Sequence, residues 1–215
     1  MIKVEKIETW GFEHAIRGMR NPLNSWEKSD SYKTHIEDAE TLETADYQFF
    51  VGENDLALMK KLYKGGSEHR KYLRQIFVSM DITAPLYWWK EFDTYKVGTV
   101  ANSCSTMHKI ADKEFTLDDF SHEYLSDASI RVFGRIINEL NFNRERFIAK
   151  PYRKDYWWNM IQLLPSSYNQ KRTETMNYEN VVTIIKQRSG HKLDEWNELV
   201  KTLEELPYIK DIMEE

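Results

Sequence analysis

Small hydroxyl and amide side chains gather in one stretch of the chain, which runs from Val97 to His108. Its small polar residues are Gly98, Thr99, Asn102, Ser103, Ser105 and Thr106. Residues of these types make a poor helix interior, and they bring many N–H and O–H donors close to the backbone. The composition is typical of a loop that contacts a ligand, and an ordinary surface loop is the alternative.

The single cysteine, Cys104, lies between two serines of this stretch. One cysteine excludes a disulfide framework and a thiolate metal site. A nearby base or a helix N-terminus could make its thiol a nucleophile, although a lone cysteine is more often an inert small residue. Both interpretations stay open.

Other familiar site motifs are missing from the sequence. The histidines, which show no HxH or HExxH spacing, are His14, His35, His69, His108, His122 and His191. There is also no CxxC pair, P-loop, GxSxG elbow or GxGxxG fingerprint. We therefore expect no metal site and no Rossmann-type nucleotide site.

A strand and a helix must position the hydroxyl-rich stretch. Residues 75–83 alternate between apolar and polar side chains, which predicts a strand that leads directly into Pro85. Proline suits a first helical turn, where its missing N–H costs nothing. The aromatic residues that follow at helical spacing are Trp88, Trp89, Phe92 and Tyr95. They predict a helix with one buried aromatic face.

The rest of the chain shows a mixture of patterns. Alternation predicts a further strand over 1–10, and a short strand is expected over 45–51. Apolar spacing and capping residues predict helices over 11–20, 55–63 (with Asn54 as N-cap), 128–140, 142–149, 155–164, 181–188 and 193–203. His14, Arg17 and Arg20 are expected on the surface of the first helix, and the polar segments 20–31 and 166–175 are expected to be loops. The mixture favours a single α+β domain over residues 1–215.

The charge pattern limits the partners. The chain has 35 acidic and 30 basic residues, a net charge of −5, and the basic residues are dispersed. This composition argues against nucleic-acid binding. No apolar run reaches about eighteen residues, and the charged N-terminus does not read as a signal peptide. We expect a soluble cytoplasmic protein with no membrane contact.

The segment APLYWWKEFDTYKVGTVANSCSTMH, residues 84–108, resembles the signature segment of the flavin-dependent thymidylate synthases. That signature reads approximately A-P-L-F-V-A-R-Q-W-x-R-H-R-x-G-S-x-N-E-x-S-x-R-Y. The positions that follow it in kind are Ala84, Pro85, Leu86, Tyr87, Lys90, Glu91, Phe92, Val97, Gly98, Thr99 and Ser105. The chain departs from it at the Arg-His-Arg, which is Thr94-Tyr95-Lys96 here, and at the late Arg, which is Met107.

Two further segments support the resemblance. His69 lies fifteen residues before Ala84. In the family, a histidine at this spacing lies beside the flavin and opens an H-E-x-x-x-E-H pattern. The second histidine of that pattern is replaced by Gln75 in this chain. Near the other end, the segment from Lys186 to Trp196 resembles the family's late helix and its nucleotide-binding arginine, here Arg188.

The resemblance implies an antiparallel sheet with several helices packed on it, and a homotetramer whose subunits share active sites. It implies methylation of dUMP, or of a related pyrimidine nucleotide, to dTMP with FAD, methylene-tetrahydrofolate and NADPH. The residues that it assigns to FAD are His69, Lys90, Glu91, Thr94 and Lys96. The residues that it assigns to the nucleotide are Thr99, Ser103, Ser105 and Arg188.

Two alternatives follow from the departures. Losing arginines at two anion-binding positions removes charge-assisted hydrogen bonds, for which Lys96, Lys109 or Arg188 could compensate. Without compensation, the chain would be a catalytically impaired homologue that acts as a nucleotide-binding, structural or regulatory oligomer. A transferase that uses Cys104 is the other alternative, although the family does not use a cysteine nucleophile.

Overall fold

The computed structural model describes residues 2–35 and 47–214. These residues form two compact units, and each unit is built from segments that are distant in the sequence. Unit 1 contains the described residues of Met1–Lys6, Met80–Glu174 and Lys192–Leu199, and unit 2 those of Ile7–Ser79, Thr175–His191 and Val200–Glu215. The expectation of a single domain stays a prediction.

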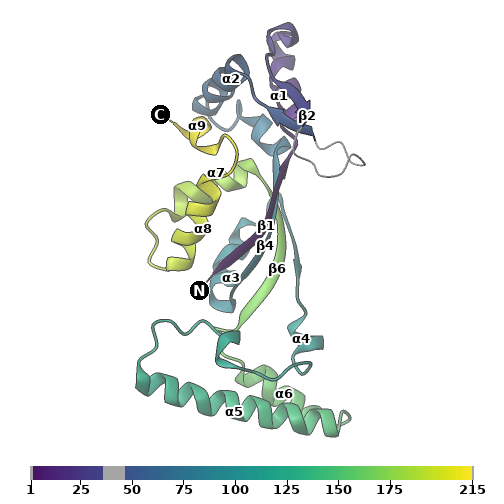
Figure 1. Ribbon diagram of the computed structural model, residues 1–215, viewed down its shortest axis with the longest axis vertical. Helices are drawn as coiled ribbons and strands as arrows, with labels where there is room; N and C mark the ends of the chain where they lie inside the picture. The colour runs from purple at the N-terminus through teal and green to yellow at the C-terminus, as the bar shows by residue number, and fades with distance from the viewer. Residues whose placement is uncertain (1, 36–46, 215) are drawn as a thin grey trace. The chain divides into compact units, whose positions relative to one another are not determined.

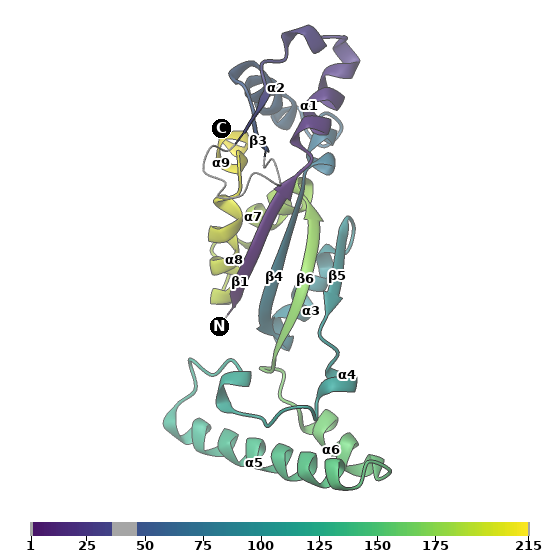
Figure 2. The same ribbon diagram turned by 45° about the vertical axis from the view of Figure 1, so that its right-hand side comes forward.

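A four-stranded antiparallel sheet is the main β structure, and its arrows alternate in direction in Figure 2. In spatial order its strands are β1 (Lys3–Trp10), β4 (Phe77–Pro85), β6 (Asn169–Asn177) and β5 (Thr99–Ser103). The strands expected over 1–10 and 75–83 are confirmed. The expected loop over 166–175 is wrong, because most of that segment is the inner strand β6.

The two faces of the sheet explain why β6 reads as polar. Thr173 and Thr175 donate hydrogen bonds to Asp81 (2.7 Å) and Ser79 (3.1 Å) of β4, so these four side chains share one face. The opposite face of β4 carries Val78, Met80 and Ile82, which are buried. On β6 that covered face carries Arg172 and Glu174 as well as Met176, so the sequence lacks the apolar alternation of a buried strand.

Unit 1 packs an aromatic helix on this covered face (Figure 1). The helix is α3 (Leu86–Phe92), and the turn η4 (Asp93–Tyr95) continues it. Trp88, Trp89 and Phe92 are buried, as their spacing predicts, and the Trp88 ring centroid lies 4.7 Å from that of Trp196 on α8 (Asp194–Glu204).

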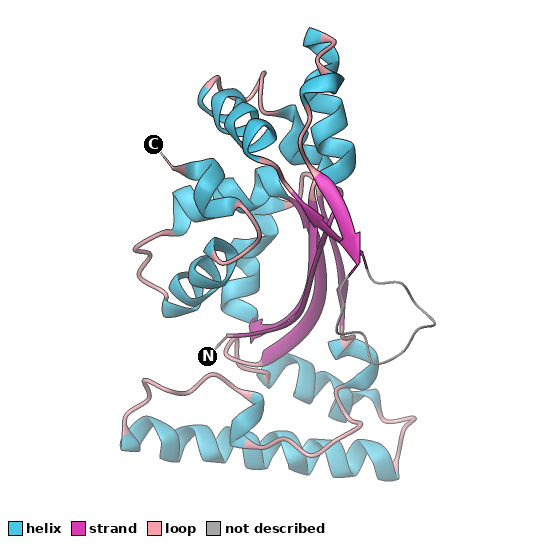
Figure 3. Ribbon diagram, turned by 45° about the horizontal axis from the view of Figure 1, so that its top comes forward, coloured by secondary structure: helices cyan, strands magenta, loops and turns pink. Residues whose placement is uncertain are grey.

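A pair of helices lies beyond one end of the sheet within unit 1 (Figures 1 and 3). They are α5 (Asp127–Ala149) and α6 (Lys154–Leu163), and two shorter elements, α4 (Thr106–Lys109) and η5 (Leu117–Asp119), precede them. The two helices expected over 128–140 and 142–149 are in fact one. Asn141, the residue between the two expected helices, lies inside α5, and its side chain exchanges 2.8 Å hydrogen bonds with the backbone of Phe115.

Unit 2 holds the remaining elements. They are α1 (Phe12–Arg20), η1 (Asn21–Leu23), η2 (Trp26–Lys28), β2 (Tyr32–His35), β3 (Tyr47–Phe50), α2 (Glu53–Lys64), η3 (Lys71–Gln75), α7 (Tyr178–Arg188) and α9 (Ile209–Met213). β2 pairs antiparallel with β3. The sequence did not indicate α9. None of the helices among residues 2–35 and 47–214 has the length and apolar composition needed to cross a bilayer.

Arg20 is buried, which corrects its expected place on the surface of α1. Its Nε lies 2.6 Å from Oδ1 of Asp55, whose side chain is also buried. The hydroxyls of Ser29 and Ser31 donate to the other oxygen of Asp55 at 2.7 and 2.6 Å. The polar segment 20–31 is therefore folded around a buried carboxylate.

The same segment moves the start of α2. Asp30 accepts the backbone N–H groups of Asn54 (2.9 Å) and Asp55 (3.1 Å), so its carboxylate satisfies the first turn of the helix. Gly52 is the N-cap in place of the expected Asn54, because the capping side chain comes from a distant residue.

Candidate functional site

The end of α3 is the first part of the predicted site, and it belongs to unit 1. Thr94 donates its hydroxyl to the carbonyl of Glu91, at 2.8 Å. The Glu91 carboxylate accepts the indole N–H of Trp196, at 2.9 Å. Tyr95 is buried. At the position of the family's Arg there is thus an exposed threonine bonded to its own helix end, and at the position of its His there is a buried tyrosine.

Two lysines supply the positive charge at this helix end. Lys90 lies in the last turn of α3 and Lys96 directly follows η4, and both side chains are exposed. Neither has an ion-pair partner among the residues that the structure describes. They are therefore available to an anionic ligand.

The hydroxyl-rich stretch is only partly a loop, which corrects the expectation. Thr99–Ser103 form β5, at the edge of the sheet, where an exposed polar strand satisfies its backbone on one side only. Ser103 is exposed on this strand, and Thr99 is half-buried. Only the residues after Ser103 make a turn.

Gln170 of β6 holds that turn in place. Its side-chain N–H groups donate to the carbonyl of Cys104 (3.0 Å) and to the hydroxyl of Thr106 (3.2 Å). The Cys104 N–H donates to the carbonyl of Lys171, at 2.9 Å. Ser105, which lies between the held residues, accepts the His108 N–H at 3.2 Å as the N-cap of α4.

A cavity of about 430 Å³ opens beside this turn in unit 1. Ser105 is the one predicted nucleotide-binding residue that lines it. Tyr168, Asn169 and Gln170 contribute further polar groups, as do Lys109 and Lys113. The lysines are paired with Asp112 and Asp119, respectively. The lining can hold a polar ligand through hydroxyl, amide and ammonium groups.

Cys104 lines the same cavity and is exposed. Within residues 2–35 and 47–214 no side chain makes a hydrogen bond to its thiol. The base that a cysteine nucleophile needs is thus not provided by the described part of the chain. The Cys104 transferase gains no support from this geometry.

A cation that the sequence patterns did not reveal lies against α3. The Arg172 guanidinium is 4.1 Å from the Trp89 ring centroid and pairs with Asp93 at 2.9 Å. Its Nε also donates to the side chain of Gln170, at 3.1 Å. Arg172 thus connects the helix end to the Ser105 turn. No local signal indicated it, because residues 166–175 read as a loop.

On the inner strands β4 and β6, two carboxyl groups have shifted pKa values. Burial raises the pKa of Glu174 to about 7, and neither of its oxygens has a hydrogen-bond partner in the described structure. On the other face, a hydrogen bond from Thr173 and the nearby Lys171 ammonium lower the pKa of Asp81. The two environments therefore shift the pKa values of Glu174 and Asp81 in opposite directions.

His69 and Arg188 belong to unit 2. His69 is exposed in the turn after α2, and its ring lies close to Gly65. Arg188 ends α7, and its guanidinium is 3.2 Å from Nε2 of His191. Their expected roles in binding flavin and nucleotide stay predictions.

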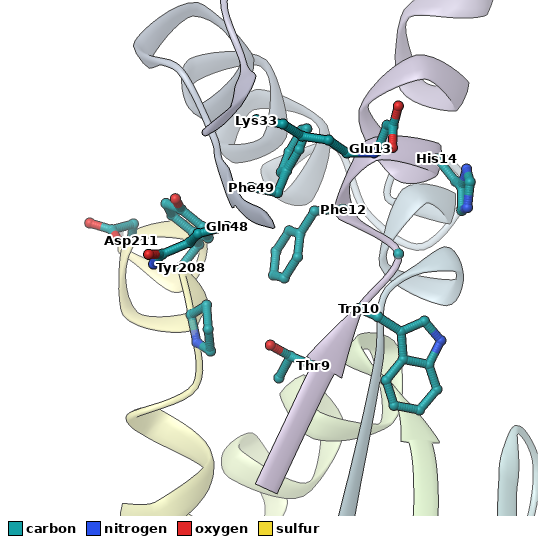
Figure 4. Close-up of a pocket in the computed structure, with 12 residues that line it drawn as sticks. Thr9, Trp10, Phe12, Glu13, His14, Lys33, Gln48, Phe49, Tyr208 and Asp211 are labelled. Atoms are coloured by element: carbon teal, nitrogen blue, oxygen red, sulfur yellow. Dashed lines mark ion pairs between the residues drawn. The ribbon is translucent and has the colours of Figure 1, made fainter. Parts of the chain in front are cut away.

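Unit 2 has a cavity of its own, of about 550 Å³ (Figure 4). Phe12 and Phe49 line it, and an ion pair between Lys33 and Glu13 (2.5 Å) lies at its edge. None of the nine predicted site residues lines this cavity. Across residues 2–35 and 47–214, no group of three His, Cys, Asp or Glu side chains is placed to hold a metal ion.

Comparison with known proteins identifies the fold. The structure is similar to a flavin-dependent thymidylate synthase from Helicobacter pylori complexed with FAD and dUMP, with a TM-score of 0.63 and 16% sequence identity over 94% of this chain and 91% of that chain. It is also similar to a UMP/dUMP methylase from Streptomyces cacaoi bound with 5-Br dUMP, with a TM-score of 0.61 and 12% identity over 95% and 88% of the two chains. No family model and no curated protein matches the sequence. The chain has the fold of flavin-dependent thymidylate synthases, which confirms the α+β architecture expected from the signature segment.

Proposed function

We propose that the protein methylates a pyrimidine nucleotide, dUMP to dTMP, with FAD, methylene-tetrahydrofolate and NADPH. The supporting observation is the shared fold. The structural similarity covers nearly the whole of this chain and most of the enzymes that were solved with FAD and dUMP or with 5-Br dUMP. The proposal includes a cytoplasmic homotetramer with shared sites, as the resemblance implies.

The residues at the end of α3 fit the charge of FAD. Its diphosphate carries two negative charges, and the exposed ammonium groups of Lys90 and Lys96 match them in number. Glu91 and Thr94 keep this helix end in shape through their bonds to Trp196 and to the backbone. When bound, FAD would supply the hydride chemistry that no side chain can perform.

The Ser105 turn and β5 are the proposed nucleotide-binding surface. Thr99, Ser103 and Ser105 offer hydroxyl groups to a sugar or a phosphate, and Arg188 offers a planar pair of charged donors. The task of these residues is to hold the pyrimidine and to stabilise the charge that develops on it.

Conversion of dUMP to dTMP in the presence of FAD, NADPH and methylene-tetrahydrofolate tests the proposal. We expect chromatography to show dTMP formed by the wild-type protein. Lys96→Ala and Ser105→Ala should each lower the rate about tenfold, which corresponds to an increase of roughly 1.4 kcal/mol in the activation free energy. Lys150→Ala, an exposed lysine at the end of α5, is the matched control and should leave the rate unchanged. Absence of dTMP from the wild-type reaction would contradict the proposed activity.

A second candidate function is a homologue without catalysis that binds nucleotides or regulates a partner as an oligomer. Thr94 uses its hydroxyl within its own helix end, and Met107, at the family's late Arg, lines an apolar pocket. Both observations favour lost phosphate binding. A stable oligomer that gives no heat with FAD or dUMP would support this candidate.

A further inference from the structure

A second pocket of unit 1 differs in character from the Ser105 cavity. Its volume is about 590 Å³, and its lining residues come from α4, α5, α6 and the segments that adjoin them. Its larger apolar lining residues include Met107, Phe147, Trp157 and Trp158. About half of the surface of Met107 (53%) and of Trp158 (49%) is open to solvent. This size is typical of pockets that hold small molecules.

The walls of this aromatic pocket are held before any ligand arrives. The indole N–H of Trp157 donates to the carbonyl of Met107, at 3.1 Å. Its ring meets the Trp158 ring edge to face, with centroids 4.8 Å apart. Arg144 fixes the chain after α4 through the carbonyl of Ala111, at 2.9 Å, and Ile110 is buried in the core. A preformed apolar surface loses little entropy when a ligand covers it.

The lining of the aromatic pocket contains basic side chains and no acidic ones. Its two residues that are not apolar are His108 and Lys154, and no acidic residue lines the pocket. Both side chains have no hydrogen-bond or ion-pair partner among the described residues, although the whole chain has a net charge of −5. The lining therefore matches a ligand with an apolar body and a negative end.

The number of positive charges limits that negative end. Among the lining residues of this pocket, Lys154 is the one lysine or arginine. Met107 occupies the position of the family's late Arg, and it gives this wall a thioether in place of a guanidinium. A single carboxylate fits this pocket better than a doubly charged phosphate.

We propose that the aromatic pocket binds a small amphipathic carboxylate, with its hydrocarbon body against the two indoles and its carboxylate at Lys154. This site is distinct from the Ser105 cavity and does not depend on the function proposed above. The class of ligand is a medium-chain aliphatic acid.

Titration of the full-length protein with sodium octanoate tests the proposal, with octan-1-ol as the uncharged probe of equal length. We expect saturable calorimetric binding of one octanoate per chain and a change in tryptophan fluorescence. Lys154→Gln should weaken octanoate at least fivefold and leave octanol unchanged, whereas Trp158→Ala should weaken both. Trp10→Ala, an exposed tryptophan of unit 2, is the control that should change neither.

Several results would overturn this inference. Octanoate binding that does not saturate would contradict the proposed site. Equal octanoate affinities of Lys154→Gln, Trp158→Ala and the wild type would contradict it as well. Equal affinity for octanol and octanoate in the wild-type protein contradicts the role of Lys154. Another such result would be that the wild type binds no octanoate and that sedimentation shows Trp158→Ala to dissociate an oligomer. This result would mean that the pocket contacts a second copy of the chain. Because Lys154 is exposed, its substitution tests the site without disturbing the fold.

Discussion

At the scale of single residues, Glu174 is the side chain whose environment conflicts most with its chemistry. It is 1% exposed, and its carboxyl oxygens make no hydrogen bond within the described structure. Arg172, two residues away on the same face, is paired with Asp93. Burial therefore raises the pKa of Glu174 from 4.5 to about 7. The folded protein holds this proton more tightly than the unfolded chain does.

This pKa predicts a specific pH dependence for Glu174→Gln. The stability that the raised pKa provides is complete below pH 4.5, and it is lost as the pH rises towards about 7. The variant cannot ionise, so its advantage over the wild type should grow from near zero at about pH 3.5 to roughly 3 kcal/mol at about pH 8. Urea denaturation at both pH values measures it. Glu8→Gln, on the exposed part of β1, is the control, and an advantage for Glu174→Gln that does not change with pH would contradict the prediction.

The buried pair of Arg20 and Asp55 leads to a second prediction. Removing one partner of such a pair leaves the other charge without compensation and typically costs 3–5 kcal/mol. The serine hydroxyls still serve Asp55, so we expect Arg20→Met to lower the free energy of unfolding by about 3 kcal/mol. Arg17→Met, one turn earlier on the exposed face of α1, should change it by less than about 0.5 kcal/mol. Equal effects of the two substitutions in urea denaturation would show that the pair contributes little.

At the scale of elements, the junction between β1 and α1 depends on Gly11. Its φ is +95°, and a Cβ atom there would lie 2.1 Å from the backbone oxygen of Gln75. Gly11→Ala should therefore cost about 2 kcal/mol or more. At Gly134, inside α5, a Cβ atom would have no neighbouring atom within 4 Å, and Gly134→Ala should stabilise the protein by about 0.5–1 kcal/mol. Melting temperatures that move in the same direction for both variants would contradict this reasoning.

Gln170 links β6 to the Ser105 turn, and its removal should affect nucleotide binding. Gln170→Leu deletes the hydrogen bonds to Cys104 and Thr106 and the hydrogen bond from Arg172, each worth about 0.5–1.5 kcal/mol. If the turn binds dUMP as proposed, calorimetry should show about tenfold weaker dUMP binding with FAD binding unchanged. Gln162→Leu, on the exposed surface of α6, is the matched control. Equal dUMP affinities of Gln170→Leu and the wild type would remove the turn from the nucleotide site.

Local patterns predicted those elements whose side chains pack in the ordinary way. The alternation of β4 and the aromatic face of α3 are both confirmed. The local pattern did not indicate β6 because its covered face carries Arg172 and Glu174, and the two helices expected over 128–140 and 142–149 left out Asn141, which lies inside α5. The partners of Arg172 and Asn141, which are Asp93 and Phe115, are distant in the sequence, so a local pattern does not include them.

At the scale of the whole molecule, the signature segment was sufficient to predict the fold at an identity of only 16%. It was not sufficient to predict the site. Of the predicted nucleotide-binding residues, Ser105 lines the unit 1 cavity, but its supports Gln170 and Arg172 come from a strand that the local pattern did not indicate. Composition could not reveal that Met107 faces an aromatic pocket, because that pocket forms only when α4 meets α6.

The visible absorbance of the purified protein is the most direct test of whether the protein binds FAD and dUMP. We expect the two-banded spectrum of oxidised flavin, either as purified or after FAD is added, and a perturbation of those bands when dUMP follows. The exposed Lys90 and Lys96 are the charges that would retain the cofactor. A colourless protein whose mixture with FAD and dUMP has the spectrum of free FAD would contradict the claim, and would leave a thymidylate-synthase fold that serves another purpose.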